Sequence, residues 1–84
     1  MIRIRYFARL SESLGLRSEE LGYRAEFASA KDIIDHLMAR GDPWAGEFGG
    51  DNRILIAVNQ EMAEPGAAVK DGDEIGFFPP VTGG

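Results

Sequence analysis

The chain opens with a regular alternation of apolar and polar side chains over residues 1–7. A period of two predicts a half-buried strand. The even-numbered residues, Ile2, Ile4 and Tyr6, are predicted to face the core. Those of the other parity, predicted to point away from the core, are Arg3, Arg5 and Phe7. Residues 21–27 alternate in the same way and predict a second strand, whose inward side chains are Leu21, Tyr23, Ala25 and Phe27.

Helical spacing follows each of these stretches. Leu10 and Leu14 stand four residues apart and Gly15 follows, which predicts a short helical turn with a glycine stop. Ser29 followed by Asp32 resembles a capping box and opens the main helix. The apolar stripe of this helix is Ala30, Ile33, Ile34, Leu37 and Met38. The side chains left on or near its solvent side are Lys31, Asp32, Asp35 and His36. Gly41 and Pro43 end the helix, and Trp44 and Phe48 are spaced to pack as one further turn over the edge of the core.

The remaining strands are predicted in the last third of the chain. Residues 54–59 alternate, but both parities are mostly apolar, so the third strand has two apolar faces. Met62 follows in a short returning strand, and Asp71-Gly72-Asp73 is a turn before the last strand, Glu74 to Phe78. The order strand, strand, helix, strand, short strand, strand predicts an α+β fold with a mixed sheet crossed by one main helix.

Length, charge and cysteine content exclude several classes of function. Eighty-four residues suffice for a single domain. The absence of cysteine excludes disulfides, thiolate metal sites and a cysteine nucleophile. A net charge of −5 disfavours binding to nucleic acid. It is compatible with a partner that has a basic docking face, or with a role in solubility alone. No apolar run approaches the roughly 20 residues that span a bilayer, and the N-terminus lacks a signal-peptide core, so we expect no membrane association and a cytoplasmic protein.

No group of side chains predicts catalysis or a metal site. His36 is the only histidine and is expected to be solvated, and the acidic residues fall in turns or surface segments. Gly49-Gly50 lacks the Lys-Ser/Thr continuation of a phosphate-binding loop.

The candidate chemistry therefore lies in the final segment, Pro79-Pro80-Val81-Thr82-Gly83-Gly84. At a usual glycine frequency of about 7%, two glycines at the end of a chain arise by chance about 0.5% of the time. Gly83 and Gly84 have no Cβ atom, so such an end can thread a narrow channel and deliver the carboxylate of Gly84 into another protein's active site. Pro79 and Pro80 end the last strand and hold the tail extended. We therefore predict a domain over residues 1–78 and a flexible tail over residues 79–84.

The octet Phe77 to Gly84, preceded by Asp71-Gly72-Asp73-Glu74-Ile75, closely resembles the end of molybdopterin synthase small subunits. Tyr6-Phe7-Ala8 and Ala57-Val58-Asn59 extend the resemblance over nearly the whole chain. The resemblance implies the ubiquitin-like β-grasp fold. The family often has arginine at the position of Ser11 and an apolar residue at the position of Arg5, so the chain departs from its pattern there.

The resemblance also implies a mechanism of sulfur transfer. An adenylating enzyme would use Mg-ATP to convert the Gly84 carboxylate to an acyl-adenylate, and a sulfur donor would displace AMP to leave a thiocarboxylate. The tail, residues Pro79, Pro80, Val81, Thr82 and Gly83, would then insert into the large subunit of molybdopterin synthase, in a heterotetramer whose catalytic side chains belong to the large subunit. There the sulfur would attack a pyranopterin precursor, and two deliveries would build the dithiolene that holds molybdenum or tungsten. This chain itself would bind no cofactor.

Strand parity adds a docking surface. Phe78 has the parity opposite to the buried Ile75 and Phe77, and the first and last strands are neighbours in a β-grasp sheet. Phe7 and Phe78 are therefore expected to form one exposed apolar patch for the partner. By resemblance to the family, Met62 is a third member.

Three other functions fit the same sequence. A sulfur carrier for thiamine thiazole synthesis shares the diglycine end, a ubiquitin-like modifier would attach Gly84 to substrate lysines, and an interaction module would use neither chemistry. The sequence leaves open which activating enzyme acts on the chain.

Overall fold

The computed structural model describes residues 1–49 and 53–79 and contains a mixed five-stranded sheet. The strands are β1 (Ile2–Tyr6), β2 (Ser18–Leu21), β3 (Leu55–Val58), β4 (Glu61–Ala63) and β5 (Glu74–Phe78). Their order across the sheet is β2-β1-β5-β3-β4. The central pair, β1 and β5, is parallel, and the other neighbours are antiparallel. The predicted α+β fold with its mixed sheet is confirmed.

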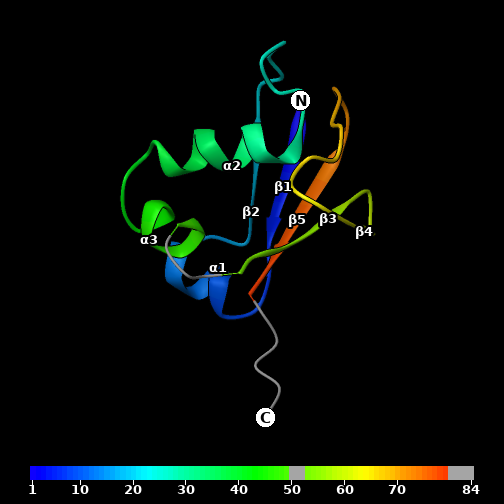
Figure 1. Cartoon of the computed structure of the whole chain (residues 1–84). Coiled ribbons are helices and arrows are strands. Elements are labelled where there is room, and N and C mark those ends of the chain that lie inside the picture. The colour runs from blue at the N-terminus through cyan, green and yellow to red at the C-terminus, as the bar shows by residue number, and fades with distance from the viewer. Residues whose placement is uncertain (50–52, 80–84) are drawn as a thin grey trace.

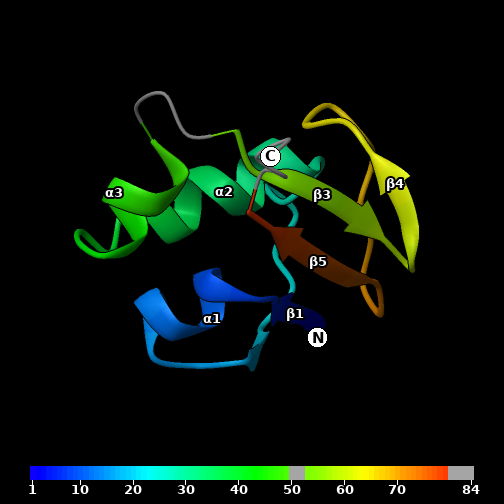
Figure 2. The same ribbon diagram turned by 90° about the horizontal axis from the view of Figure 1, so that it is seen from below.

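The helices lie on one side of this sheet (Figures 1 and 2). They are α1 (Arg9–Leu14), α2 (Ala30–Met38) and α3 (Trp44–Phe48). The short turn predicted between the first strands is α1, and it ends at Gly15, whose φ of 75° is in the left-handed region. The turn predicted at Trp44 and Phe48 is α3, which buries Phe48.

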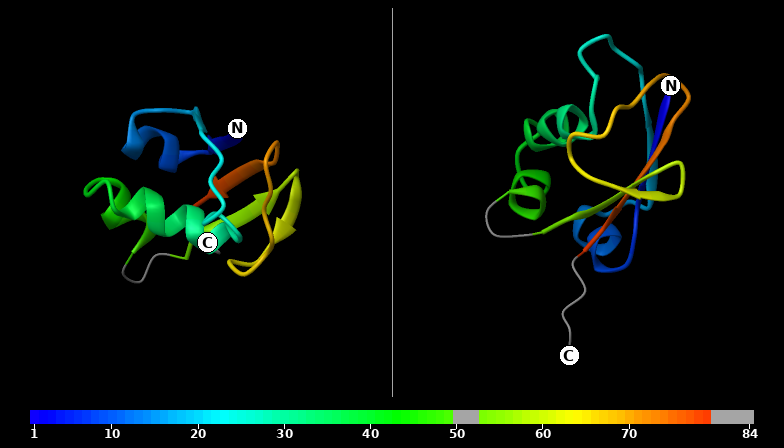
Figure 3. Two further views of the ribbon diagram at one scale, coloured as in Figure 1. Left: turned by 90° about the horizontal axis from the view of Figure 1, so that it is seen from above. Right: turned by 45° about the vertical axis from the view of Figure 1, so that its right-hand side comes forward.

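The main helix, α2, begins where the sequence predicts. The Ser29 side chain accepts from the Asp32 backbone N–H, and the Asp32 carboxylate accepts in return from the Ser29 backbone, which completes the capping box. These hydrogen bonds to the Ser29 backbone and side chain hold the pKa of Asp32 below its usual value. The segment before β5 passes beside the start of α2 (Figure 3), where Ala30 and Lys31 donate their backbone N–H groups to Ala67 and Pro65.

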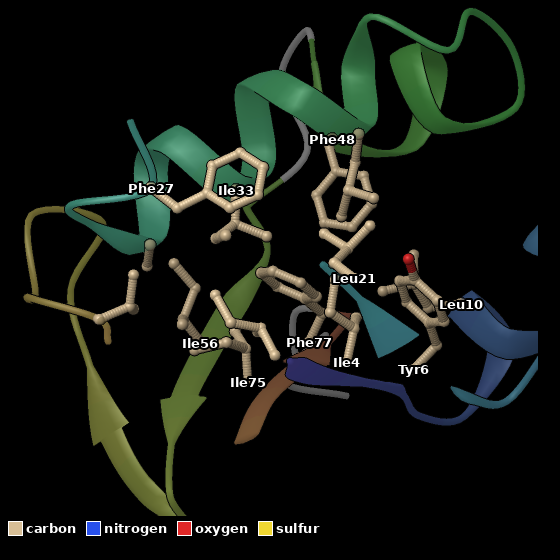
Figure 4. Packing of buried hydrophobic residues seen from close by; sticks show 14 of the residues in the cluster. Ile4, Tyr6, Leu10, Leu21, Phe27, Ile33, Phe48, Ile56, Ile75 and Phe77 are labelled. Carbon is tan, nitrogen blue, oxygen red and sulfur yellow. The ribbon is translucent and has the colours of Figure 1, made fainter. Parts of the chain in front are cut away.

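The core fills the space between the helices and the sheet (Figure 4). Ile2, Ile4 and Tyr6 are all buried from β1, as their parity predicts. They meet Ile75 and Phe77 of β5 and residues of every helix. The stripe of α2 buries Ala30, Ile33 and Leu37 fully, whereas Ile34 and Met38 lie half-buried at its margins. His36 is not freely solvated, because its side chain is half-buried. Its ring packs edge-on against the Phe27 ring, with the ring centroids 5.2 Å apart.

The predicted strand over residues 21–27 is wrong. The strand in this region is β2, which begins at Ser18 and ends at Leu21, opposite Ile2. Because Ile2 is the first residue of β1, the neighbouring strand offers no pairing partner beyond Leu21. The chain turns instead, with a hydrogen bond from the Phe27 N–H to the Arg24 carbonyl, and Tyr23 is 41% exposed instead of buried. Ala25 is exposed as well, and only Leu21 and Phe27 of the predicted inward set are buried.

Two further predictions concern the ends of the chain and membranes. Residues 80–84 lie outside the described part of the structure, so the predicted tail is represented by Pro79 alone, and Pro79 follows β5 without joining the sheet. Within residues 1–49 and 53–79, no helix has the length and apolar character needed to cross a membrane.

Candidate functional site

The face of the sheet opposite the helices carries rows of side chains set by the strand register. One row crosses four strands, because Arg5 is opposite Gly76, Gly76 is opposite Ala57, and Ala57 is opposite Met62. A neighbouring row, nearer the C-terminal end of β5, contains Leu55 opposite Phe78. We call this surface the outer face. It includes the apolar second side of β3 that the sequence predicts.

Phe7 and Phe78 lie together on the outer face. Their rings stack with centroids 4.4 Å apart and planes within 6° of parallel, and we call this pair the aromatic stack. The Phe7 N–H also donates to the Phe77 carbonyl, which fixes the register of the two chains at this point. Both rings are half-buried, so the patch is less exposed than the sequence predicts, although its two phenylalanines are neighbours as expected.

Gly76 lets the aromatic stack lie close to the sheet. A Cβ atom at this position would come within 3.1 Å of the Phe7 ring and 3.5 Å of the Phe78 ring. Residue 76 therefore has room for hydrogen but not for a larger side chain unless the rings shift. The glycine allows two large apolar side chains to cover backbone that would otherwise face solvent.

Met62 lies across a shallow hollow from the aromatic stack. The hollow has a volume of about 240 Å³, and Phe7, Phe78, Ala57 and Met62 line its apolar part. Met62 is 66% exposed, the highest value among the large apolar side chains of the described residues. Leu55, at 37% exposed, lies on the same face beside Phe78. We did not predict Leu55 as a site residue, although the apolar second parity of β3 was a signal for it.

A hairpin turn positions Met62. Asn59 and Gln60 connect β3 to β4 with φ angles of 51° and 70°, which residues other than glycine adopt rarely. Asn59 compensates by hydrogen bonding: its side-chain oxygen accepts from the Glu74 N–H, and its amide donates to Asp73 at 3.0 Å. Asp73 is buried and also accepts from the Lys70 N–H. The hydrogen bond from Asn59, followed by that from Lys70, holds the pKa of Asp73 below its usual value. The hairpin is thus tied to the start of β5.

A polar cluster closes the core at the other end of the sheet, where Tyr6 pairs with Phe77. The Tyr6 hydroxyl donates to Glu19 at 2.7 Å and accepts from the Trp44 indole at 3.3 Å. Arg40 binds Glu19 through two nitrogens, at 2.7 and 2.9 Å, and its guanidinium lies 4.9 Å from the centre of the Trp44 ring. These four residues join β1, β2, α3 and the end of α2. No pattern in the sequence predicts the cluster, because its members are far apart along the chain.

The cluster shifts the ionisation of its members. Burial raises the pKa of Tyr6 far above its usual value, so the phenol stays protonated. Burial alone would also raise the pKa of Glu19, but hydrogen bonds from Arg40 and Tyr6 outweigh it, and the net direction is downward. The Glu19 carboxylate in turn raises the pKa of Arg40. These groups are satisfied by one another, which is typical of a structural cluster.

The described residues contain no group of side chains suited to a metal ion. Among residues 1–49 and 53–79, no three His, Cys, Asp or Glu side chains are grouped so that they could hold a metal ion. The predicted reactive residue, Gly84, and the tail residues Pro80, Val81, Thr82 and Gly83 lie outside the described residues. The structure brings together Phe7, Phe78 and Met62, and it places Pro79 directly after the aromatic stack.

Comparisons with known proteins agree with this architecture. A model of the ThiS family matches residues 4–84. The chain is 40% identical to the molybdopterin synthase sulfur carrier subunit of Haemophilus influenzae and 38% identical to that of Escherichia coli, in each case over 100% of both chains. Among solved structures it is similar to SAMP1, the small archaeal modifier protein 1 of Haloferax volcanii, with a TM-score of 0.76 and 32% identity, covering 99% of this chain and 98% of the other. The resemblance seen in the final octet thus extends over the whole chain.

Proposed function

This chain belongs to the ThiS family, and we propose that within it the protein is the sulfur carrier subunit of molybdopterin synthase. The observation that carries the proposal is the 40% identity to the Haemophilus influenzae sulfur carrier subunit over the full length of both chains. The aromatic stack and Met62 support it, because they offer an apolar surface directly beside the residue where the tail begins.

The reactive group in this proposal is the carboxylate of Gly84. A carboxylate has no adequate leaving group, so an adenylating enzyme first joins it to the α-phosphate of Mg-ATP and releases pyrophosphate. Sulfide delivered by a donor then attacks the carbonyl carbon, AMP leaves, and a thiocarboxylate remains. The absence of cysteine leaves no side-chain thiol to carry the sulfur.

This chain's part in the transfer is to bind and to position. The aromatic stack and Met62 dock on the large subunit, and Pro79 and Pro80 direct the tail away from the sheet. Gly83 and Gly84 pass through a channel too narrow for a Cβ atom. The thiocarboxylate sulfur then attacks the pyranopterin precursor in the large subunit and forms a thioester. Water hydrolyses the bond between the Gly84 carbonyl and sulfur, which returns the carboxylate and leaves the sulfur on the precursor, and two loaded carriers complete the dithiolene.

Reconstitution tests the proposal. The loaded carrier and the large subunit of the same organism should convert the precursor to a dithiolene. The conversion is measured by the fluorescence of the oxidised product. Removal of Gly84 should abolish conversion while leaving binding to the large subunit measurable. Conversion by the carrier without Gly84 would contradict the proposal.

A second function is favoured by the similarity to a protein named as a modifier. In that case Gly84 would form an isopeptide bond with lysines of other proteins. The same loaded carrier, incubated in an extract of its own organism, distinguishes the two: lysine conjugates that end in Gly84 support the modifier, and a thiazole product would instead indicate thiamine synthesis.

A further inference from the structure

The surroundings of the aromatic stack are cationic, although the chain as a whole is acidic. The whole sequence has a net charge of −5. At the end of the sheet where β5 stops, however, three arginines are gathered: Arg5 in β1, Arg9 at the start of α1, and Arg17, whose carbonyl accepts from the Tyr6 N–H. Two carboxylates lie beside them: Glu12 lines the same hollow as Arg5 and Arg17, and Glu74 is 3.8 Å from Arg5. Glu19 is paired with Arg40, so these three arginines outnumber the carboxylates beside them. Charge is therefore distributed unevenly along the molecule.

Arg5 is held against the aromatic stack without a strong partner. Its guanidinium carbon lies 5.2 Å from the centre of the Phe7 ring, within the range of a cation–π contact. Its nearest carboxylate is that of Glu74, at a long 3.8 Å, and 47% of the Arg5 side chain remains exposed. Such a pair contributes little to stability and is readily exchanged for a better one. Arg9 and Arg17 form no ion pair within residues 1–49 and 53–79.

Two of these arginines line one open hollow. The hollow lies between β1 and α1, has a volume of about 600 Å³, and is lined by Arg5 and Arg17 together with Phe7, Ser11 and Glu12. It adjoins the outer face, since Arg5 and Phe7 line both this hollow and the one beside Met62. Guanidinium groups form paired hydrogen bonds with carboxylates, so two guanidiniums around an open space match an acidic side chain.

We infer that this hollow receives an acidic side chain of the large subunit, held by Arg5 and Arg17, next to the apolar contact of the aromatic stack. The inference rests on the proposed function and names the chemistry of its partner surface: carboxylates beside an apolar pocket. It also revises the expectation from net charge, which suggested a basic docking face on the partner. The local charge at the docking end, and not the total, determines which partner surface is complementary.

Charge reversal with a matched control tests the inference. Arg5→Glu and Arg17→Glu are compared with Arg24→Glu, which makes the same change in the loop between β2 and α2, at the opposite end of the molecule from the end of β5 (Figure 1). Affinity for the large subunit is measured by surface plasmon resonance at about 0.1 M and about 1 M salt, where charges are screened beyond about 10 Å and 3 Å. We expect each reversal at the hollow to weaken binding about tenfold at the lower salt, mainly through slower association, and Arg24→Glu to leave it unchanged.

Arg5→Gln guards against misfolding, because a glutamate at position 5 would face Glu74. It should retain the melting temperature of the natural chain. On a logarithmic scale, its loss of affinity for the large subunit should be about half that of Arg5→Glu. Equal weakening by Arg24→Glu, or an effect of Arg5→Glu that is as large at high salt as at low salt, overturns the inference. The inference is also overturned if the hollow binds inorganic phosphate and neither reversal changes affinity for the large subunit. In that case the hollow is a site for a free anion. If the natural chain does not bind the large subunit, the proposed function fails as well. If it binds and the reversals have no effect, only the inference fails.

Discussion

Phe77 and Phe78 are adjacent residues of the same type, and the sheet sends them to opposite sides. Phe77 is fully buried and contacts the rings of Tyr6 and Phe48 in the core. Phe78 is half-buried and stacks on Phe7 alone, on the outer face. The difference separates two tasks within one strand: the inward side chain stabilises the fold, and the outward side chain is available to a partner.

The surroundings of the two rings follow the same division. Inward neighbours come from every helix, and the polar groups at the edge of the core pair with one another. Outward neighbours are small or exposed, namely Gly76, Ala57 and Met62, and they leave an open hollow. A change on the core face should therefore alter stability more than binding, and a change on the outer face should do the reverse.

The largest expected effect is on the core face. Phe77→Ala removes a fully buried ring and leaves a cavity, which should lower the free energy of unfolding by about 3 to 5 kcal/mol, measured by urea denaturation. Phe77→Leu should cost less and provides a folded variant. An affinity of Phe77→Leu for the large subunit far below that of the natural chain would break the division between the faces.

The matched change on the outer face is Phe78→Ala. Loss of an aromatic side chain at the centre of an interface commonly costs about 2 kcal/mol or more, so affinity for the large subunit should fall about thirtyfold. The free energy of unfolding should fall by only about 1 kcal/mol, the usual contribution of one aromatic pair. Calorimetry measures both quantities. A large loss of stability with unchanged affinity would assign Phe78 to the core after all.

A smaller effect is expected at the polar edge of the core. Glu19→Gln removes the charge that pairs with Arg40 and should cost about 1 kcal/mol at neutral pH, a value reduced by partial exposure to solvent. Because the pKa of Glu19 is lowered in the folded protein, its contribution is complete above the unfolded value and is lost as pH falls through the folded value. Stability of the natural chain should therefore decline in acid more steeply than that of Glu19→Gln. Parallel pH profiles would rule out this role for the carboxylate.

The smallest effect on stability is expected at Met62. Met62→Ala should change the free energy of unfolding by less than about 0.5 kcal/mol, because the side chain is largely exposed. Affinity for the large subunit should still fall about fivefold, or roughly 1 kcal/mol. Tyr23→Ala, a change in the loop after β2 at a side chain that is 41% exposed, is the control and should leave affinity for the large subunit unaltered. Equal effects of the two changes would remove Met62 from the docking surface.

The sequence predicted most of this division, and its failures have physical causes. Parity placed Phe7 and Phe78 outward and Ile4 and Phe77 inward, because the period of a strand leaves only two choices. The strand over residues 21–27 failed because alternation describes side chains and not pairing: β2 is paired with β1 only as far as Leu21, opposite Ile2. Contacts between distant residues, such as Tyr6 with Glu19 and Arg40 with Trp44, leave no periodic trace in the sequence.

The outer face shows a second limit. Arginines 5 and 17 are far apart in the sequence, and only the pairing of Arg5 with Ser18 in neighbouring strands brings their surroundings together. Net charge was uninformative for the same reason, since it averages over both ends of the molecule. The exposure of Phe78 was also overestimated, because Phe7 covers part of it.

Intact mass measurement shows whether Gly84 carries the sulfur. The chain is incubated with its activating enzyme, Mg-ATP and a sulfur donor, and the mass of the product is measured whole and then as peptides. We expect a mass increase equal to the difference between one sulfur and one oxygen atom, located in the peptide that ends in Gly84 and dependent on ATP. An unchanged mass, or sulfur found on any other part of the chain, would contradict this expectation.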